Sequence, residues 1–323
     1  MTRWTMPGFS FPQRLYSIRW ASGDRIVHLC TLTAAMSILS ITAFLVYELY
    51  IHSSLSRKTF GWAFLASSSW DPVRAEFGAL PFIYGTLVSS CLALLIAVPL
   101  GVGAAIFLSE MTRPRLARTL AFLVELLAAV PSVIYGLLGI LLIVPLLRNW
   151  LQPFVQSTLG FLPLFEGPMF GVSMLAAVVV LTIMILPFIV AVSREALLAV
   201  PRDQREAALA VGATRWEATW NVVLPYAKLG LLSSVFLSFA RAVGETMAVT
   251  MVIGNAPRIS ASLFAPSYTI AAVIANEFME AGTEVHFSAL IELGLVLLVI
   301  TAAINGLARL VISGTAKNGR PQK

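Results

Sequence analysis

The chain has 323 residues, of which 58% are hydrophobic and only 12% are charged, with a formal net charge of +6 at pH 7. A soluble domain carries about 25% charged residues, so this chain has too few charges to coat soluble domains of that total length. The composition therefore predicts an integral membrane protein.

Six apolar segments are long enough to cross a bilayer, which takes about 20 residues. Apolar residues run all round each segment, which favours helices over barrel strands, where apolar and polar residues alternate. The predicted helices cover residues 28–51, 80–109, 117–146, 170–193, 226–253 and 287–312. The fold class is thus an all-α membrane protein with six transmembrane helices.

These segments divide the chain into five parts. We expect a tail at 1–27, a first transmembrane helix at 28–51, an external segment at 52–79, a core with five transmembrane helices at 80–312, and a tail at 313–323. The first apolar run is longer than the roughly 7–15 residues of a signal-peptide core, so we expect no cleavable leader.

The basic residues lie mostly on one side of the predicted topology. Both tails and the loops after the second and fourth helices, with the helix ends that lead into them, hold 16 of the 22 Lys and Arg residues, and the opposite side holds five. The 16 are Arg3, Arg14, Arg19, Arg25, Arg113, Arg115, Arg118, Arg194, Arg202, Arg205, Arg215, Lys228, Arg309, Lys317, Arg320 and Lys323. Because cytoplasmic loops are enriched in Lys and Arg, we expect both termini in the cytoplasm of a bacterial inner membrane.

Neither cysteines nor histidines suggest a metal site. Cys30 and Cys91 lie in apolar runs without a CxxC motif, and the three histidines are scattered near span ends. We therefore expect no metal, no cofactor and no catalytic residue in this chain.

The predicted cytoplasmic loop 194–228 carries helix signals of its own. Pro201 suits a first helical turn, Gly212 suits a left-handed helix end, and Thr214 with Glu217 fits a capping box. Pro225 marks the entry to the next span. We expect two short helices joined by a tight glycine turn, as either an amphipathic hairpin on the membrane surface or a docking element for a cytoplasmic partner.

The fifth span places a charged pair in its apolar run. Arg241 is predicted near mid-depth, where an arginine costs about 2.5–3.5 kcal/mol on insertion scales. Glu245 follows one turn later, and Ser234 and Ser238 precede Arg241 on the same helix face. This polar stripe is expected to face the bundle interior or a watery cavity. It indicates either an ion pair that only holds the bundle in register or an anion pathway.

Two further acids, Glu125 and Glu292, lie near the ends of predicted spans, and we do not place them on the pathway. Snorkelling or packing pairs are the interpretation that their positions favour.

The loop sequence EAALAVG followed by VVLP resembles the EAA loop of ATP-binding-cassette importer permeases. The matching residues are Glu206, Ala207, Ala208, Gly212, Leu224 and Pro225. In that superfamily the loop forms coupling helices that sit in a cleft of a separate ATPase subunit. This agrees with the absence of GxxxxGK[ST], the phosphate-binding loop motif, from the chain.

Five further blocks resemble the phosphate-specific permease family, PstC type, in matching order. They are GTLVSS at 85–90, PLGVGAAIFLSE at 99–110, VPSVIYGLLG at 130–139, MILPFIVAVSREAL at 184–197 and RAVGETMAVTMVIGN at 241–255. The resemblance implies a type I importer permease fold and import of inorganic phosphate past Arg241. It also implies a second homologous permease of PstA type, two ATPase subunits that bind ATP and magnesium, and an external phosphate-binding protein.

Three other functions stay open on the sequence. A permease of the same superfamily for molybdate or sulfate is the nearest, since those also carry Gly-Glu at this place. An ion-coupled secondary transporter usually shows paired repeats of broken helices, and no convincing repeat is present. A membrane enzyme would need clustered His, Cys or carboxylate residues at one membrane face. For Glu245, two roles are open: restraining Arg241, or accepting a hydrogen bond from a protonated phosphate oxygen.

Overall fold

The computed structural model describes residues 17–318, and their side chains from 24 to 314. The parts of the predicted tails at 1–16 and 319–323, with Arg3, Arg14, Arg320 and Lys323, lie outside the described residues. The chain forms two units, which divide after Ile51.

The first unit is essentially one long helix. Helix α1 spans Ser17–His52, and its membrane-length stretch Asp24–His52 exposes large apolar side chains such as Ile38 and Phe44 along its whole length. The helix thus begins earlier than the predicted boundary at residue 28. Hydropathy marks only the part of a helix that crosses hydrocarbon, because helical hydrogen bonds continue equally well outside it.

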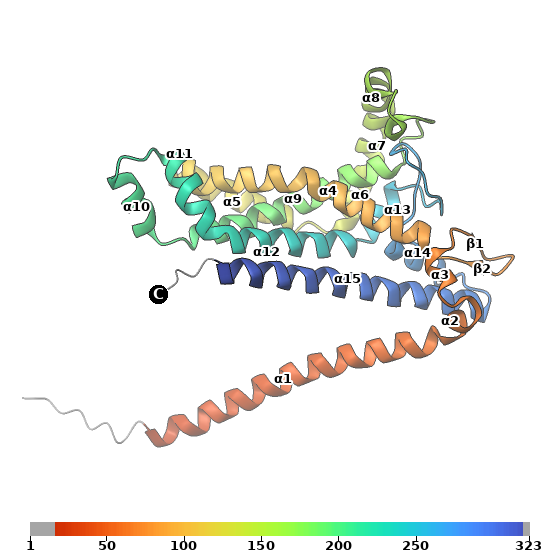
Figure 1. Ribbon diagram of the computed structural model, residues 1–323, viewed down its shortest axis with the longest axis horizontal. Helices are drawn as coiled ribbons and strands as arrows, with labels where there is room; N and C mark the ends of the chain where they lie inside the picture. Colours follow the sequence, from red (N-terminus) through yellow and green to blue (C-terminus); the bar gives the residue numbers. More distant parts are fainter. Residues whose placement is uncertain (1–16, 319–323) are drawn as a thin grey trace, which may run out of the picture. The chain divides into compact units, whose positions relative to one another are not determined.

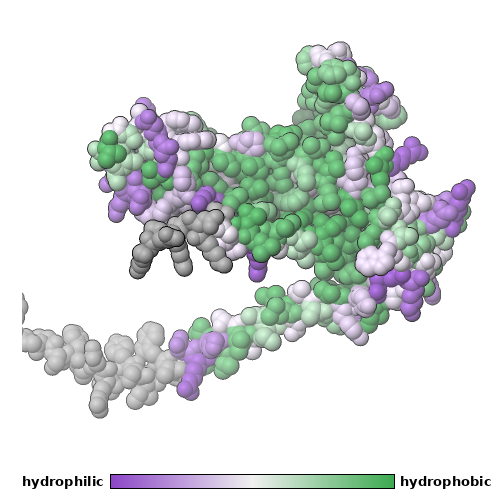
Figure 2. Space-filling view, viewed as in Figure 1, coloured by the Kyte–Doolittle hydropathy of each residue, from purple (hydrophilic) through white to green (hydrophobic). Residues whose placement is uncertain are grey.

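The second unit is a helical bundle built around α9, Met174–Leu198 (Figure 1). Helix α4, Leu80–Ile106, and helix α12, Leu224–Val243, pack against α9, and α15, Glu284–Asn318, packs against α12. Leu181, Ile185 and Ile189 of α9 are fully buried. Figure 2 shows apolar residues over the middle of this bundle and hydrophilic residues at its two ends, the distribution expected of a membrane-crossing unit.

One end of the bundle carries the loop 194–228, with α10 at Arg202–Ala210 and α11 at Arg215–Ala218 (Figure 1). The opposite end carries α2, Ser54–Phe60, α3, Ala63–Ala66, and α14, Ile270–Glu277. A small antiparallel hairpin at this end pairs β1, Trp70–Asp71, with β2, Glu76–Phe77, in the register Trp70 to Phe77 and Asp71 to Glu76.

The predicted external segment 52–79 packs on the bundle through aromatic residues. Phe64 and Phe77 are buried beside Phe82 of α4, and Trp70 Nε1 donates to Glu277 Oε2 at 2.9 Å. Trp62, by contrast, is 88% exposed. Burial raises the pKa of the nearby Tyr268 phenol to about 12. Most of this segment is therefore part of the folded bundle, which leaves Trp62 as a free aromatic surface.

The described residues contain six helices long and apolar enough to cross a membrane, which agrees with the predicted number. They are Asp24–His52, Leu80–Met111, Ser132–Leu159, Met174–Leu198, Arg215–Val243 and Glu284–Gly314. The last helix continues to Asn318, past the predicted end at residue 312.

The third predicted span, 117–146, is wrong as a single helix. The structure divides it into α5, Pro114–Ala128, and a second helix that begins at Ser132. Pro131 lies between them, with φ −57° and ψ 138°. A proline lacks the N–H that would continue the helix, and its ring disfavours helical backbone in the preceding residue.

The second of these helices runs through to Leu159 by alternating helix types. It consists of α6, Ser132–Leu138, a π turn at Gly139–Ile143, α7, Val144–Leu146, a π turn at Leu147–Leu151, and α8, Gln152–Leu159. Pro145 and Pro153 each follow two residues after a π turn. Proline has no N–H to donate to the preceding turn. The wider π turn accommodates this missing hydrogen bond, so the helix continues through both prolines.

Two more short elements complete the bundle. A π turn at Phe107–Met111 extends α4, and a 3₁₀ turn at Pro163–Phe165 follows α8.

The fifth predicted span, 226–253, is also wrong as a single helix. Helix α12 ends at Val243, and a separate short helix, α13, covers Met247–Val252. Gly244 to Thr246 form the break between them. Glycine is a poor residue for a helix interior, at about 1 kcal/mol relative to alanine, and apolar character alone does not reveal such a stop. Helix α13 then packs tightly on α6, where a Cβ added to Gly136 would lie 2.6 Å from Met251 Sδ.

Candidate functional site

Arg241 lies in the last turn of α12, and its side chain is exposed. Its guanidinium carbon is 5.8 Å from the ring centre of Phe188 in α9. Phe188 is two residues from Leu186, the midpoint of α9 (Met174–Leu198). Arg241 therefore lies beside the middle of α9, a helix with the length of a membrane crossing, and its predicted depth in the membrane stays a prediction.

Two local features favour a cation at this position. The aromatic face of Phe188 attracts the guanidinium, an interaction of about 0.5–2 kcal/mol. The carbonyl end of α12 adds about 0.3–1 kcal/mol for a cation in its last turn. Their sum does not reach the larger estimates for an arginine in hydrocarbon, so an exposed Arg241 requires water or another protein beside it.

Glu245 does not follow Arg241 on one helix face, so the predicted i, i+4 pair is wrong. The helix stops at Val243, and Glu245 lies in the break before α13. Its Oε1 accepts a hydrogen bond from the backbone N of Ala248 at 3.2 Å, and the side chain is half-buried. Among the described side chains, no ion pair joins Glu245 to Arg241. The carboxylate instead satisfies an amide at the start of α13.

The predicted stripe also separates into two environments. Ser234 and Ser238 are fully buried between α12 and α9. The Oγ atoms of Ser234 and Ser193 are 2.8 Å apart, and Ser238 Oγ donates to the carbonyl of Ser234 at 2.7 Å. The hydroxyl of Ser234 thus links α12 to α9, whereas that of Ser238 is satisfied within α12. Their predicted role on a pathway stays a prediction.

The loop 194–228 has the predicted glycine turn. Gly212 has φ +91°, the left-handed conformation that favours glycine, and no atom lies within 4 Å of an added Cβ. Glycine is therefore favoured at position 212 by the backbone conformation, and not by a lack of room for a side chain.

The capping box after the turn is confirmed. Glu217 N donates to Thr214 Oγ1 at 3.3 Å, and Thr214 N donates to Glu217 Oε2 at 2.8 Å. The side chains of Thr214 and Glu217 thus each accept a hydrogen bond from the other residue's backbone amide.

The second helix of the hairpin is not a separate short helix, contrary to the prediction. Arg215–Val243 forms one continuous helix, in which a π turn at Thr219–Val223 joins α11 to α12. Pro225 follows this π turn by two residues, in the same relation as Pro145 and Pro153 to theirs. Leu224 and Pro225 therefore lie inside the helix, and the hairpin is rigidly continuous with the helix that carries Arg241.

The residues of the EAA-like motif differ in exposure. Glu206 and Ala207 are exposed on α10, whereas Ala208 is buried toward the bundle. Beside the turn, Val211 is 86% exposed and Trp216 is 57% exposed. The hairpin thus exposes a carboxylate and two large apolar side chains at one end of the bundle.

Arg205 is a residue that the sequence interpretation missed. Its side chain forms a two-point ion pair with Glu110, in the π turn that ends α4, with Nη2 2.9 Å from Oε1 and Nε 3.1 Å from Oε2. The partners are far apart in sequence, so no local spacing predicts the pair. The sequence offered one indication of it. Glu110 is an acid at the end of an apolar run, on the same predicted side as the basic loop 194–228.

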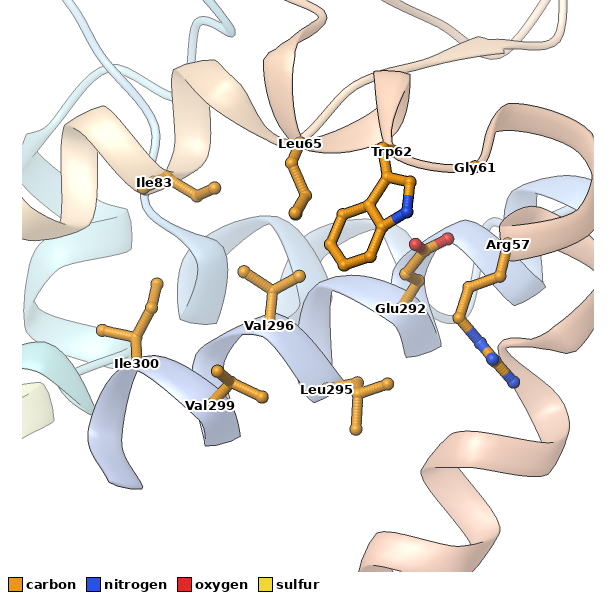
Figure 3. Close-up of a pocket in the computed structure, with 10 residues that line it drawn as sticks. All are labelled: Arg57, Gly61, Trp62, Leu65, Ile83, Glu292, Leu295, Val296, Val299 and Ile300. Atoms are coloured by element: carbon orange, nitrogen blue, oxygen red, sulfur yellow. The ribbon is translucent and has the colours of Figure 1, made fainter. Parts of the chain in front are cut away.

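A separate cavity of about 650 Å³ lies between α2, α3 and α15 (Figure 3). Glu292 and Arg57 are at one end of it, and Ile83, Val299 and Ile300 line the other. Glu292 is 6% exposed, so of the two predicted interpretations, snorkelling and a packing pair, burial excludes snorkelling. The cavity is mostly apolar and includes none of the predicted pathway residues, so we do not assign it to an anion route.

Residues 97–317 match the family model described as binding-protein-dependent transport system inner membrane component. The chain is also 46% identical over 298 residues to the phosphate transport system permease protein PstC of Mesorhizobium japonicum, covering 91% of each chain. The chain belongs to this permease family. It is 39% identical to the probable PstC of Methanocaldococcus jannaschii over 73% of its length and 75% of the relative.

The fold has a solved counterpart in this type of transporter. A chain of a bacterial ABC transporter involved in the import of the acidic polysaccharide alginate superposes with a TM-score of 0.57, covering 89% of this chain and 98% of that one. At 17% identity the likeness concerns the fold alone. The protein is therefore a multi-pass membrane protein with the fold of an ABC importer permease, and it serves as a permease subunit.

Proposed function

We propose that this chain is the membrane-spanning permease subunit of an ATP-driven importer that carries inorganic phosphate into the cell. The relatives named phosphate transport system permease support the substrate, and their similarity covers most of the chain. The observation that carries the proposal is Arg241, an exposed arginine beside the midpoint of α9.

Arg241 suits an oxyanion for chemical reasons. Its planar guanidinium matches two oxygens of a phosphate and stays charged at any relevant pH. Since its side chain points out of this chain, a second permease subunit of PstA type is needed to enclose it. The pathway then lies between the two permease subunits, with Arg241 on one wall.

Glu245 gives the pathway a means of selecting phosphate. It lies in the interrupted backbone between α12 and α13, and non-helical backbone at membrane depth is tolerated where it is buried in protein or lines a water-filled cavity. In the proposal its second carboxylate oxygen accepts a hydrogen bond from a protonated oxygen of phosphate, a donor that sulfate lacks near neutral pH. Ser234 and Ser238 keep the packing role described above.

The hairpin 201–222 docks on an ATPase subunit. Glu206 and Ala207 on α10, with Val211 and Trp216 at the tip, provide an exposed surface of mixed chemistry for a helix-in-groove contact. Two ATPase subunits bind ATP and magnesium, and this chain contributes no cofactor site and no bond-making or bond-breaking step. ATP-driven closure of the ATPases moves the hairpin, and the continuous helix Arg215–Val243 carries the movement to Arg241.

This assignment fixes the orientation of the chain. ATP is cytoplasmic, so the hairpin end of the bundle faces the cytoplasm of a bacterial inner membrane, and the β1–β2 end faces outward (Figure 1). Both termini are then cytoplasmic, in agreement with the excess of Lys and Arg on that side. An external phosphate-binding protein meets the outward end, where Trp62 is exposed.

The test is phosphate uptake by vesicles that contain this chain, its partner permease and the ATPase subunits, with the binding protein added. Uptake that needs ATP on the side of the membrane that carries the ATPase subunits, and that continues when a protonophore is added, supports the proposal. Uptake that continues without ATP under a proton gradient contradicts it. Preferred uptake of sulfate or molybdate would assign the chain to another oxyanion.

A further inference from the structure

Arg205 connects three elements that otherwise end separately at the cytoplasmic end of the bundle. It lies on α10, one residue before Glu206 of the EAA-like motif. Its partner Glu110 lies in the π turn that follows α4. Arg205 also donates to the carbonyls of Leu197 and Val200, at the end of α9. The side chain of Arg205 is 21% exposed and that of Glu110 is 10% exposed, so the link is largely shielded from water.

The contacts use most of the hydrogen-bonding capacity of the guanidinium. Nε and Nη2 form the fork to Glu110, Nη2 also donates to Leu197 O at 2.7 Å, and Nη1 donates to Val200 O. A lysine has a single ammonium and cannot form this planar fork. The last carbonyls of a helix lack partners within it, so Arg205 also caps α9.

We propose that Arg205 and Glu110 are positioning residues that couple the hairpin to α4 and α9, so that the three elements move as one body. The inference rests on the proposed docking of the hairpin to an ATPase subunit and adds the joint that transmits the movement. Besides this joint, α10 contacts α11 and the π turn Thr219–Val223, and Ala208 is its buried residue.

Helix α9 extends this connection to the candidate pathway. From Leu197 at the joint it runs to Phe188, which contacts Arg241, and its Ser193 meets Ser234 between the two positions. A displacement of α10 therefore reaches Arg241 by two routes, through the helix Arg215–Val243 and through α9.

The experiment compares three variants in the complete transporter complex reconstituted in vesicles. Arg205→Lys keeps the charge and removes the fork, and Glu110→Gln weakens the same link from α4. Arg115→Lys is the control, since Arg115 is exposed on α5, outside the docking hairpin, and its side chain makes no hydrogen bond or ion pair with the described residues. Co-purification with the ATPase subunits, ATP hydrolysis and phosphate uptake are measured for each.

If the Arg205–Glu110 link has this role, its loss should uncouple ATP hydrolysis from phosphate transport and leave the assembly with the ATPase subunits intact. Both Arg205→Lys and Glu110→Gln should co-purify with the ATPase subunits and hydrolyse ATP, while the phosphate transported per ATP falls by about tenfold, within the usual range of coupling between sites. The control should keep the wild-type ratio. A merely structural role would reduce the amount of folded complex and leave that ratio unchanged.

Three outcomes would overturn the inference. They are an unchanged ratio in both variants, an equal fall in the control, and loss of co-purification in both variants, which would make the link part of docking itself. If only Arg205→Lys fails to assemble, Glu110→Gln decides alone because it lies outside the hairpin. Failure of the wild-type complex to import phosphate would instead contradict the proposed function.

Discussion

The guanidinium of Arg241 lies 5.8 Å from the ring centre of Phe188, which places a charged side chain beside the midpoint of the most buried helix of the bundle. The contact places the guanidinium of Arg241 beside α9. The carboxylate of Glu245 is hydrogen-bonded to Ala248, so the two residues are not a neutralised pair. Arg241 therefore keeps its charge available to an anion.

Glu245→Gln should change selectivity more than assembly. The amide oxygen of Gln can still accept from Ala248 N, so the start of α13 is preserved. The amide loses the negative charge that favours a protonated anion, so the preference for phosphate over sulfate should fall by about tenfold, the equivalent of about 1.4 kcal/mol. Competition between labelled phosphate and sulfate in uptake measures this. Unchanged discrimination would remove Glu245 from substrate selection.

Ser234→Ala should lower stability and leave transport intact. The change leaves the buried Ser193 hydroxyl without its side-chain partner, at a cost of about 1–3 kcal/mol. Thermal unfolding of the detergent-solubilised complex and phosphate uptake are the two measurements. Ser233→Ala is the control, since its exposed hydroxyl bonds only to Leu229 O of its own helix. A transport defect without a stability change would place Ser234 on the pathway, as the sequence first indicates.

Glu206→Lys should prevent association with the ATPase subunits. Glu206 is exposed on α10 and makes no hydrogen bond or ion pair with the described residues, so the permease should still fold. Glu195→Lys is the matched control, because Glu195 is an exposed acid on α9 before the hairpin. Co-purification with the ATPase subunits is the readout. Normal association of Glu206→Lys would show that the hairpin docks elsewhere or not at all.

Thr214→Ala should open the start of the helix Arg215–Val243. Loss of an N-cap hydroxyl costs about 1 kcal/mol, which corresponds to roughly fivefold faster exchange of the local amide hydrogens. The amides of Thr214 and Glu217 report it by hydrogen exchange, since each is bonded within the capping box. Thr119→Ala, on an exposed turn of α5, should leave them unchanged. Equal exchange rates in Thr214→Ala and wild type would mean that the box does not stabilise this end.

The sequence predicted the elements that depend on local chemistry. Apolar length gave six spans, and Gly212 with Thr214 and Glu217 gave the turn and the capping box, because the backbone requirement there is local. The third and fifth spans were wrong because hydropathy does not sense where a helix stops. Pro131 is a strong stop signal, whereas Gly244 is a weak one, since glycine is tolerated inside helices at about 1 kcal/mol.

The candidate site was predictable in its residue types and not in its pairings. Arg241 was identifiable as a charge in an apolar run, but its contact with Phe188 joins residues of different helices. The same holds for Arg205 with Glu110 and for Ser193 with Ser234. Such contacts are set by the register of helices against each other, which local spacing and hydropathy in the sequence do not reveal.

The central claim, that phosphate passes Arg241 in an ATP-driven importer, is tested most directly by Arg241→Gln. ATP-dependent phosphate uptake is measured in vesicles that contain the assembled complex, with Arg115→Gln, an exposed arginine on α5, as the control. The account predicts that Arg241→Gln assembles normally with its partners and loses phosphate uptake by at least about tenfold, while Arg115→Gln transports as the wild type does. Wild-type phosphate uptake by a fully assembled Arg241→Gln complex would contradict it.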